Sequence, residues 1–304
     1  TTLGKRLTMF GEEMLVAFRR LDQMIQQYPL RGLKGAVGTS LDQLTLLDGD
    51  VDRLEQLQTQ VRHHLGFQCE LGAVGQIYPR SLDFDVLSCL YQLGSGIANL
   101  ARTIRLMAGN EMLTEGFAAG QVGSSAMPHK MNTRSTERIN GLQVVVGGYV
   151  HMVGALAGDQ WFEGDVSCSV VRRVALPDSF FAFDGMVETM LHVLDDMGAY
   201  EAVIAKDLDR YLPFLTTTTL LMEAIQRGAG REQAHAAIKE HALATALEMR
   251  ERGLADNDLA DRLGSDARFP LTAGEIGEIL SQSRGLTGLA SQQGESFARQ
   301  GEEM

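Results

Sequence analysis

Apolar residues recur at steps of three and four along most of the chain, the spacing that places them on one face of an α-helix. In residues 84–109 the stripe consists of Val86, Leu90, Leu93, Ile97, Leu100, Ile104 and Met107. A second stripe runs over 137–157 and a third over 171–197, where Pro177 predicts a kink. No stretch alternates apolar and polar residues between turn signals, as half-buried strands do. We therefore predict an all-α fold in which long helices form a bundle.

The pattern changes near residue 200, where the amphipathic segments become shorter. The segments 213–227 and 231–252 are each followed by a glycine, a residue that commonly ends helices. This change predicts two domains: a central helical-bundle domain over 1–199 and a smaller C-terminal helical domain over 200–304.

Composition limits the classes of function. The 304 residues are 44% apolar, enough for a sizeable core, and the net charge of -12 argues against broad contact with nucleic acids or membranes. An anionic substrate would need a local cluster of Lys and Arg against this background. No apolar run approaches the ~20 residues that span a bilayer, and the first residues do not resemble a signal peptide. Three widely spaced cysteines, Cys69, Cys89 and Cys168, indicate neither a disulfide framework nor a metal site, so we expect a cytoplasmic protein.

The segment 116–138, GFAAGQVGSSAMPHKMNTRSTER, lies between two predicted helices and lacks an apolar stripe. Most such segments are surface connectors. Here, however, Ser124 is the first of two adjacent serines, and Lys130 and Asn132 add a cation and an amide. Thr136 is predicted to cap the next helix, whose first amides favour an anion. A base beside positive charge is what removal of a proton next to a carboxylate requires.

Residues 123–132, GSSAMPHKMN, resemble the signature GSSxMPxKxN of the fumarase/aspartase superfamily. Its members are all-α tetramers that eliminate fumarate, or a close relative, from a succinyl substrate. The resemblance implies that Ser124 is the general base that takes the Cβ proton. It also implies that Lys130 and Asn132 hold the carboxylate as it becomes an aci-carboxylate.

Four further segments narrow the resemblance to the adenylosuccinate lyase family, and with the late TGLASQQ they extend it over nearly the whole chain. They are LRGLKGAVGTS at 30–40, GQIYPRSLDFDVLS at 75–88, RSTER at 134–138 and DQWFEGDVSCSVVRR at 159–173.

By this resemblance, Gln76 contacts a substrate amide, Arg138 contacts the nucleotide, and Ser169 and Arg173 contact phosphate and ribose. Each has an alternative, since a lone Gln76 is more often an ordinary loop residue. Arg173, with Arg172, also suits a solvated helix face. We give His129, inside the signature, no catalytic role, and we expect His235 and His241 to be structural.

The sequence departs from the family at three points. Ser40 stands where the family has Gln, and Gly164 stands where it commonly has Arg, so one phosphate contact is missing or comes from another residue. We interpret Gly164 as lineage variation of an actinobacterial-like member. The third departure is the family's general-acid histidine, which lies in an HxQPAQ-type motif just before the stretch that matches Thr1 and Thr2. Neither that motif nor the N-terminal domain around it is in this sequence.

The resemblance implies β-elimination of fumarate from adenylosuccinate, giving AMP, and from the succinyl-carboxamide imidazole ribotide of purine biosynthesis. It implies no metal or organic cofactor, and a homotetramer whose active sites combine residues of three subunits. One rival hypothesis is another fumarate-releasing lyase, such as an argininosuccinate lyase; Arg138, Ser169 and Arg173 favour a phosphorylated substrate instead. The other rival is a non-catalytic truncated helical scaffold, which the intact signature opposes. Without the histidine, we expect residues 1–304 to assemble yet release no measurable fumarate by themselves.

Overall fold

The computed structural model describes residues 1–116, 127, 131–164 and 166–303. The contacts within the chain divide these residues into two compact units. One contains Leu3–Gly198 and Gln292–Met304, and the other contains Thr1–Thr2 and Ala199–Ser291. The boundary after residue 198 lies next to the predicted change of pattern, while the last helix groups with the first unit.

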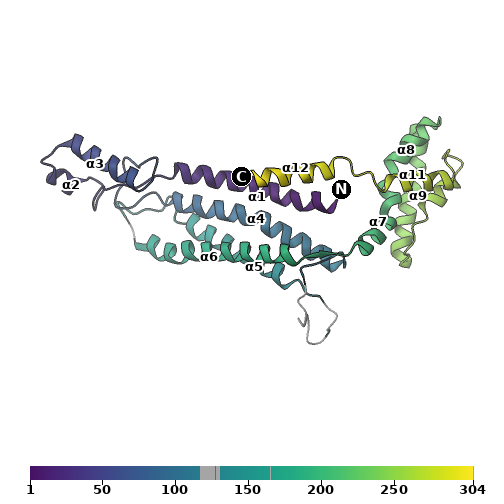
Figure 1. The fold of residues 1–304 in the computed structure, drawn as a ribbon, viewed down its shortest axis with the longest axis horizontal. Helices are drawn as coiled ribbons and strands as arrows, with labels where there is room; N and C mark the ends of the chain where they lie inside the picture. Colours follow the sequence, from purple (N-terminus) through teal and green to yellow (C-terminus); the bar gives the residue numbers. More distant parts are fainter. Residues whose placement is uncertain (117–126, 128–130, 165, 304) are drawn as a thin grey trace. The chain divides into compact units, whose positions relative to one another are not determined.

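Four long helices form the bundle of the first unit (Figure 1). They are α1 (Leu3–Gln27), α4 (Ser81–Gly109), α5 (Arg134–Gly154) and α6 (Val166–Asp196). The predicted helices over 84–109, 137–157 and 171–197 are thereby confirmed, with starts three to five residues earlier. The helix α6 continues through Pro177, where a kink was predicted.

The apolar stripes meet in the centre of this bundle. The main core joins α1, α4, α5 and α6 through buried side chains that include Phe10, Ile97, Ile104, Ile139, Met186 and Val193. A second cluster lies toward the start of α4 and contains Leu87, Val153 and Ala175. Glycines allow close packing at two points: a Cβ on Gly96 would lie 2.6 Å from Met14 Cγ, and one on Gly94 would lie 2.3 Å from Gln143 Oε1. Gly94 and Gly96 therefore have a packing role.

Shorter elements complete the first unit. The helices α2 (Leu41–Leu46) and α3 (Val51–His64) lie between α1 and α4 in sequence. The last helix, α12 (Ala290–Glu302), reaches α1, where the Phe297 ring occupies the space that a side chain on Gly11 would need. The only strands in the described residues are two pairs of residues, β1 (Leu113–Thr114) and β2 (Gly198–Ala199), which pair with each other. The all-α class predicted from periodicity is confirmed.

The second unit is a cluster of five helices, of which all but α9 are shorter than those of the bundle. They are α7 (Glu201–Leu215), α8 (Thr217–Gln226), α9 (Arg231–Arg252), α10 (Leu259–Gly264) and α11 (Ala273–Ser283). Their core includes Leu220, Ile238, Leu259, Leu263 and Ile276. The helix predicted over 231–252 is confirmed, and Gly253 ends it with a left-handed φ of 64°.

The single helix predicted over 213–227 is wrong. Two helices meet there, because α7 ends at Leu215 and α8 begins at Thr217. Between them, the Thr216 hydroxyl donates to the carbonyl of Leu212 at 2.9 Å, and Pro213 supplies no N–H for an intrahelical bond. The Thr216 hydroxyl is thus a second donor to the Leu212 carbonyl, which also accepts from the Thr216 N–H at 3.1 Å.

Candidate functional site

At one end of the bundle, the loop that carries Gln76 lies against the segment that precedes α6. The N–H of Ile77 donates to the carbonyl of Glu163 at 3.3 Å. Gln76 itself is exposed, and its Oε1 lies 2.9 Å from the point where a Cβ on Gly164 would stand. Any side chain at 164 would therefore press on the Gln76 carboxamide in this arrangement. The glycine that replaces the family's usual Arg is the residue that leaves room for Gln76 here.

A buried ionic network lies directly behind this loop. Asp83 is 2% exposed and accepts from the Tyr78 hydroxyl at 2.7 Å and from Arg172 Nε at 2.7 Å. Arg172 Nη2 also donates to the Tyr78 oxygen. The guanidinium of Arg80, a residue 5% exposed, stacks over the Tyr78 ring at 4.4 Å and lies 3.8 Å from Asp83 Oδ2. Burial, followed by the hydrogen bond to Asp83, raises the pKa of Tyr78 to about 12.

The same network fixes the start of α6, on which two predicted substrate residues lie. Ser169 is half-buried and Arg173 is exposed. Arg172 points into the network instead, so the solvated-face alternative is wrong for Arg172, whereas Arg173 does lie on an exposed face. Gln76, Ser169 and Arg173 thus belong to elements that meet at one end of the bundle.

The opposite end of the bundle carries Asn132 and Arg138. Asn132 is half-buried just before α5, and Arg138 is exposed in the second turn of that helix. Ser124 and Lys130, like His129, lie outside the described residues.

A carboxylate from the same chain occupies the first turn of α5. Glu115 accepts from the backbone N–H of Ser135 at 2.9 Å, and from the N–H and hydroxyl of Thr136 at 3.0 Å each. The N-cap position belongs to Thr133, so the prediction of Thr136 as the cap is wrong. The anion that these amides bind is Glu115, which connects the residues before and after the signature segment.

The two sets of predicted residues lie far apart within one chain. Gln76 precedes the 29-residue helix α4, and the segment leading to Asn132 follows it. At ~1.5 Å per residue this helix is roughly 43 Å long. The start of α6 lies against the start of α4, because Arg172 pairs with Asp83. The start of α5 lies against the end of α4, because Asn140 pairs with Arg105. Figure 1 shows these three helices side by side. One chain's Gln76, Ser169 and Arg173 therefore do not share a site with its own Asn132 and Arg138.

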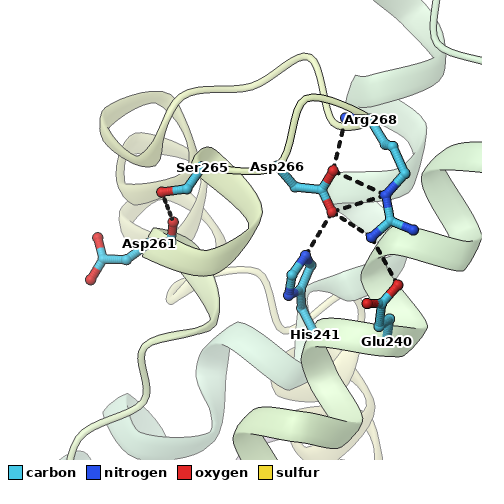
Figure 2. Close-up of polar contacts among 6 residues, drawn as sticks. All are labelled: Glu240, His241, Asp261, Ser265, Asp266 and Arg268. Atoms are coloured by element: carbon cyan, nitrogen blue, oxygen red, sulfur yellow. Dashed lines mark hydrogen bonds and ion pairs between the residues drawn. The ribbon is translucent and has the colours of Figure 1, made fainter.

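The histidine expected to be structural in the second unit forms part of a polar cluster (Figure 2). His241 Nε2 lies 2.7 Å from Asp266 Oδ2, and Arg268 bridges Asp266 and Glu240 at 2.6 and 2.8 Å. Hydrogen bonds from Arg268 and then from His241 hold the pKa of Asp266 well below its usual range. The side chains of this polar cluster pair with one another, as we expect if His241 has a structural role.

Sequence reasoning missed Tyr78, Asp83 and Glu115 as groups that organise the site. Tyr78 and Asp83 were inside the quoted motif at 75–88, and an Asp three residues before Val86, in line with the apolar stripe, is a signal for a buried partner. Glu115 gave no comparable signal, because its partners are 20 and 21 positions away.

In the described part of the chain, no helix is long and apolar enough to cross a membrane.

Two family models match the chain. The model described as "Lyase" matches residues 1–148, and the one described as "Adenylosuccinate lyase C-terminus" matches residues 213–297.

Curated relatives extend this similarity over almost all of the sequence. The chain is 33% identical to the adenylosuccinate lyase of Saccharomyces cerevisiae over 299 residues, and 34% identical to that of Schizosaccharomyces pombe over 297. These alignments cover 98% of this chain, but only 62% and 61% of the relatives. The chain thus spans about three fifths of the length of the curated relatives it matches.

Solved structures of other proteins have the same fold as this chain. A 3-carboxy-cis,cis-muconate lactonizing enzyme from Pseudomonas putida superposes with a TM-score of 0.76 at 20% identity, over 98% of this chain and 65% of that one. A fumarate lyase from Mesorhizobium gives a TM-score of 0.74 at 16% identity, over 98% and 63%. The family models and the curated relatives thus make the chain similar to adenylosuccinate lyases over almost all of its length, and the solved structures share its fold.

Proposed function

We propose that the protein is an adenylosuccinate lyase, a carbon–nitrogen lyase of purine nucleotide biosynthesis. It cleaves adenylosuccinate to AMP and fumarate, and it cleaves the succinyl-carboxamide imidazole ribotide in the same way. The observation that carries this proposal is the intact ten-residue signature at 123–132, in a chain similar to curated adenylosuccinate lyases over 98% of its length.

The chemistry follows from the side chains assigned by resemblance. Ser124 takes the proton from the succinyl Cβ, and the electron pair of that C–H bond moves toward the neighbouring carboxylate. Lys130 and Asn132 stabilise the resulting aci-carboxylate, because a cation and an amide donor favour the added negative charge. The electron pair then forms the C=C bond of fumarate as the C–N bond breaks, and a general acid protonates the leaving nitrogen. Acid–base groups and electrostatics suffice for this sequence, so we assign no metal or organic cofactor.

Substrate recognition divides between the two ends of the bundle. In this proposal, Gln76 binds a substrate amide at one end, with Ser169 and Arg173 on phosphate and ribose, while Arg138 binds the nucleotide from the other end. Because these ends are separated by the length of α4, a complete site needs more than one copy of the chain. This supports a homotetramer with active sites shared between subunits.

Exposed apolar side chains on the bundle also support assembly. On α6, Val166, Val170, Val174 and Phe181 are 77%, 64%, 44% and 75% exposed. The first three lie four residues apart and therefore on one helical face. Contiguous apolar surface of this kind marks protein–protein contacts. We propose that bundles of neighbouring subunits cover it in a cytoplasmic tetramer.

The first experiment measures fumarate release from adenylosuccinate by the purified protein in its complete natural form, and by its Ser124→Ala variant. Loss of a general base typically costs about 10²–10⁴-fold. Ser125→Ala, which removes the neighbouring hydroxyl, is the matched control and should keep most activity. If Ser124→Ala retained more than about a tenth of kcat, a loss under ~1.4 kcal/mol, Ser124 would not be the base. Turnover of argininosuccinate in place of adenylosuccinate would overturn the substrate assignment.

A second experiment tests shared sites. Arg138→Ala and Arg173→Ala change proposed substrate residues at opposite ends of the bundle, so mixing the two variants and allowing subunits to exchange should restore activity in hybrid oligomers. Light scattering should report a tetramer for each variant. A monomer, or hybrids no more active than their parents, would contradict the proposal.

A further inference from the structure

We infer that Asp83, Arg172, Tyr78 and Arg80 form a positioning unit that sets Gln76 relative to Ser169 and Arg173. This inference rests on the proposed function, because it concerns how the same substrate site is held in place. None of the four is itself assigned to the substrate. They act through the segments that carry the substrate residues.

The unit is built around a carboxylate that water does not reach. Asp83 is 2% exposed, and each of its oxygens accepts a hydrogen bond of 2.7 Å, one from Tyr78 and one from Arg172. A buried charge is tolerated only while its partners stay in place, since an unpaired ion in the interior is strongly unfavourable. The geometry around Asp83 is therefore narrowly defined.

This geometry is transmitted to Gln76 through a short segment held on both sides. Tyr78 lies two residues after Gln76. On the other side of Gln76, the carbonyl of Gly75 accepts a hydrogen bond from Arg31 Nη2 at 2.7 Å. The bond from Ile77 to Glu163 attaches the same segment to the stretch before α6. Gln76 is thus an exposed side chain on a backbone fixed at its neighbours.

On α6, the unit determines which way the helix faces. Successive residues of an α-helix differ by about 100° around its axis, so Arg172 directed at Asp83 turns Arg173 outward. Ser169 lies three residues before Arg172, on a neighbouring part of the helix surface. Rotation or sliding of α6 that moved Arg173 or Ser169 would have to break the bond between Arg172 and Asp83.

The unit also carries an excess of positive charge. Two guanidinium groups, of Arg80 and Arg172, face one carboxylate, and Arg80 Nε and Nη1 make no hydrogen bond in the described structure. In a protein with a net charge of -12, such a local excess favours a phosphorylated, polycarboxylate substrate at this end.

The test uses two adjacent arginines that the structure separates by role. Arg173→Ala removes a proposed phosphate contact, so it should raise KM about 10–100-fold for adenylosuccinate and little for dephosphorylated succinyl-adenosine. Arg172→Ala should raise KM for both substrates, because it displaces Gln76 as well as α6. Arg172→Lys, which keeps a cation at this position, should recover part of the loss.

A double-mutant cycle with Gln76→Ala measures the link directly. Arg172→Ala and Gln76→Ala should be clearly less than additive, since the first already misplaces the Gln76 side chain, whereas Arg173→Ala and Gln76→Ala should be nearly additive. Tyr78→Phe, which removes one hydroxyl and keeps the ion pair, should show the Arg172→Ala pattern more weakly and guards against a variant that fails to fold.

Four outcomes would overturn the inference. A KM effect of Arg172→Ala confined to the phosphorylated substrate would make Arg172 a direct contact. If Arg172→Ala lowered the Tm and left KM unchanged, Arg172 would be purely structural. The same would follow if the effects of Arg172→Ala and Gln76→Ala on KM were additive. Hydrogen exchange gives a readout that does not depend on turnover: amides of residues 75–80 should exchange faster in Arg172→Ala than in Arg173→Ala. Equal exchange refutes positioning, while absent turnover in the wild type refutes the proposed function alone.

Discussion

The two units each hold an aspartate between basic side chains, yet the surroundings differ. In the bundle, the side chains of Asp83 and Arg80 are 2% and 4% exposed and that of Arg172 is 25% exposed. In the other unit, Asp266 lies between Arg268 and His241, whose side chains are 39% and 21% exposed (Figure 2). The two clusters should differ in energy, because solvent screens the second cluster more than the first. We therefore expect the buried cluster to position the proposed site and the more exposed one to contribute a modest part of local stability.

The largest expected effect is that of Asp83→Asn. It leaves two arginines without their carboxylate in a buried environment and should lower the stability of the bundle by about 3–5 kcal/mol. Thermal and urea denaturation of the variant would measure the loss. Asp85→Asn, two residues along the same helix at an exposed position, is the control and should change stability by under ~0.5 kcal/mol. Similar losses for both variants would remove the distinction between buried and exposed clusters.

A smaller effect is expected from Glu115→Gln at the other end of the bundle. The carboxylate satisfies three donors in the first turn of α5, and an amide oxygen replaces it without the charge that the helix terminus favours. We expect a loss of about 1–2 kcal/mol and a lower kcat, because the affected residues flank the signature segment. Unchanged amide exchange at Ser135 and Thr136 would show that this cap is dispensable. The exposed Glu111→Gln serves for comparison.

Breaking the exposed cluster should cost still less. Asp266→Asn removes the charge that Arg268 and His241 share, and partial solvent exposure limits the loss to about 1 kcal/mol. Since none of these residues belongs to the proposed site, KM for adenylosuccinate should stay at the wild-type value. Steady-state kinetics alongside a melting curve decides this; a raised KM would connect the second unit to substrate binding. Asp261→Asn, at an exposed position nearby, is the control.

The smallest effect concerns acid sensitivity at the start of α11. The Thr272 backbone N–H, followed by the side chains of Arg227 and Thr272, lowers the pKa of Glu275 from 4.5 to about 2. Because the folded pKa is below the unfolded one, the carboxylate stabilises the unit above pH ~4.5, and this contribution is lost as pH falls toward ~2. The Tm difference between wild type and Glu275→Gln should therefore shrink over that range. A difference that stays constant with pH would contradict the assignment.

Much of the fold could be predicted from local pattern alone. The stripe at 84–109 places its apolar residues on one face whatever that face meets, so α4 was predictable. Gly253 ends α9 because glycine adopts a positive φ without strain, a property of the residue itself. The signature at 123–132 is contiguous, and its resemblance to the superfamily needs no tertiary information. Where side-chain hydrogen bonds competed with the helix, as at Thr216, the local pattern gave the wrong boundary.

The sequence by itself determined the helical class, the long stripes, the family signature and the candidate chemistry, since each depends on residues close together along the chain. Only the tertiary structure decided that Arg172 turns inward while Arg173 stays exposed, because its partner Asp83 is 89 positions away. The tertiary structure also brought the Glu115 carboxylate to the first amides of α5 and placed Gly164 next to Gln76. Finally, it placed the two sets of candidate residues at opposite ends of α4. Burial and ion pairing depend on which distant segments the core brings together, and no local spacing encodes that.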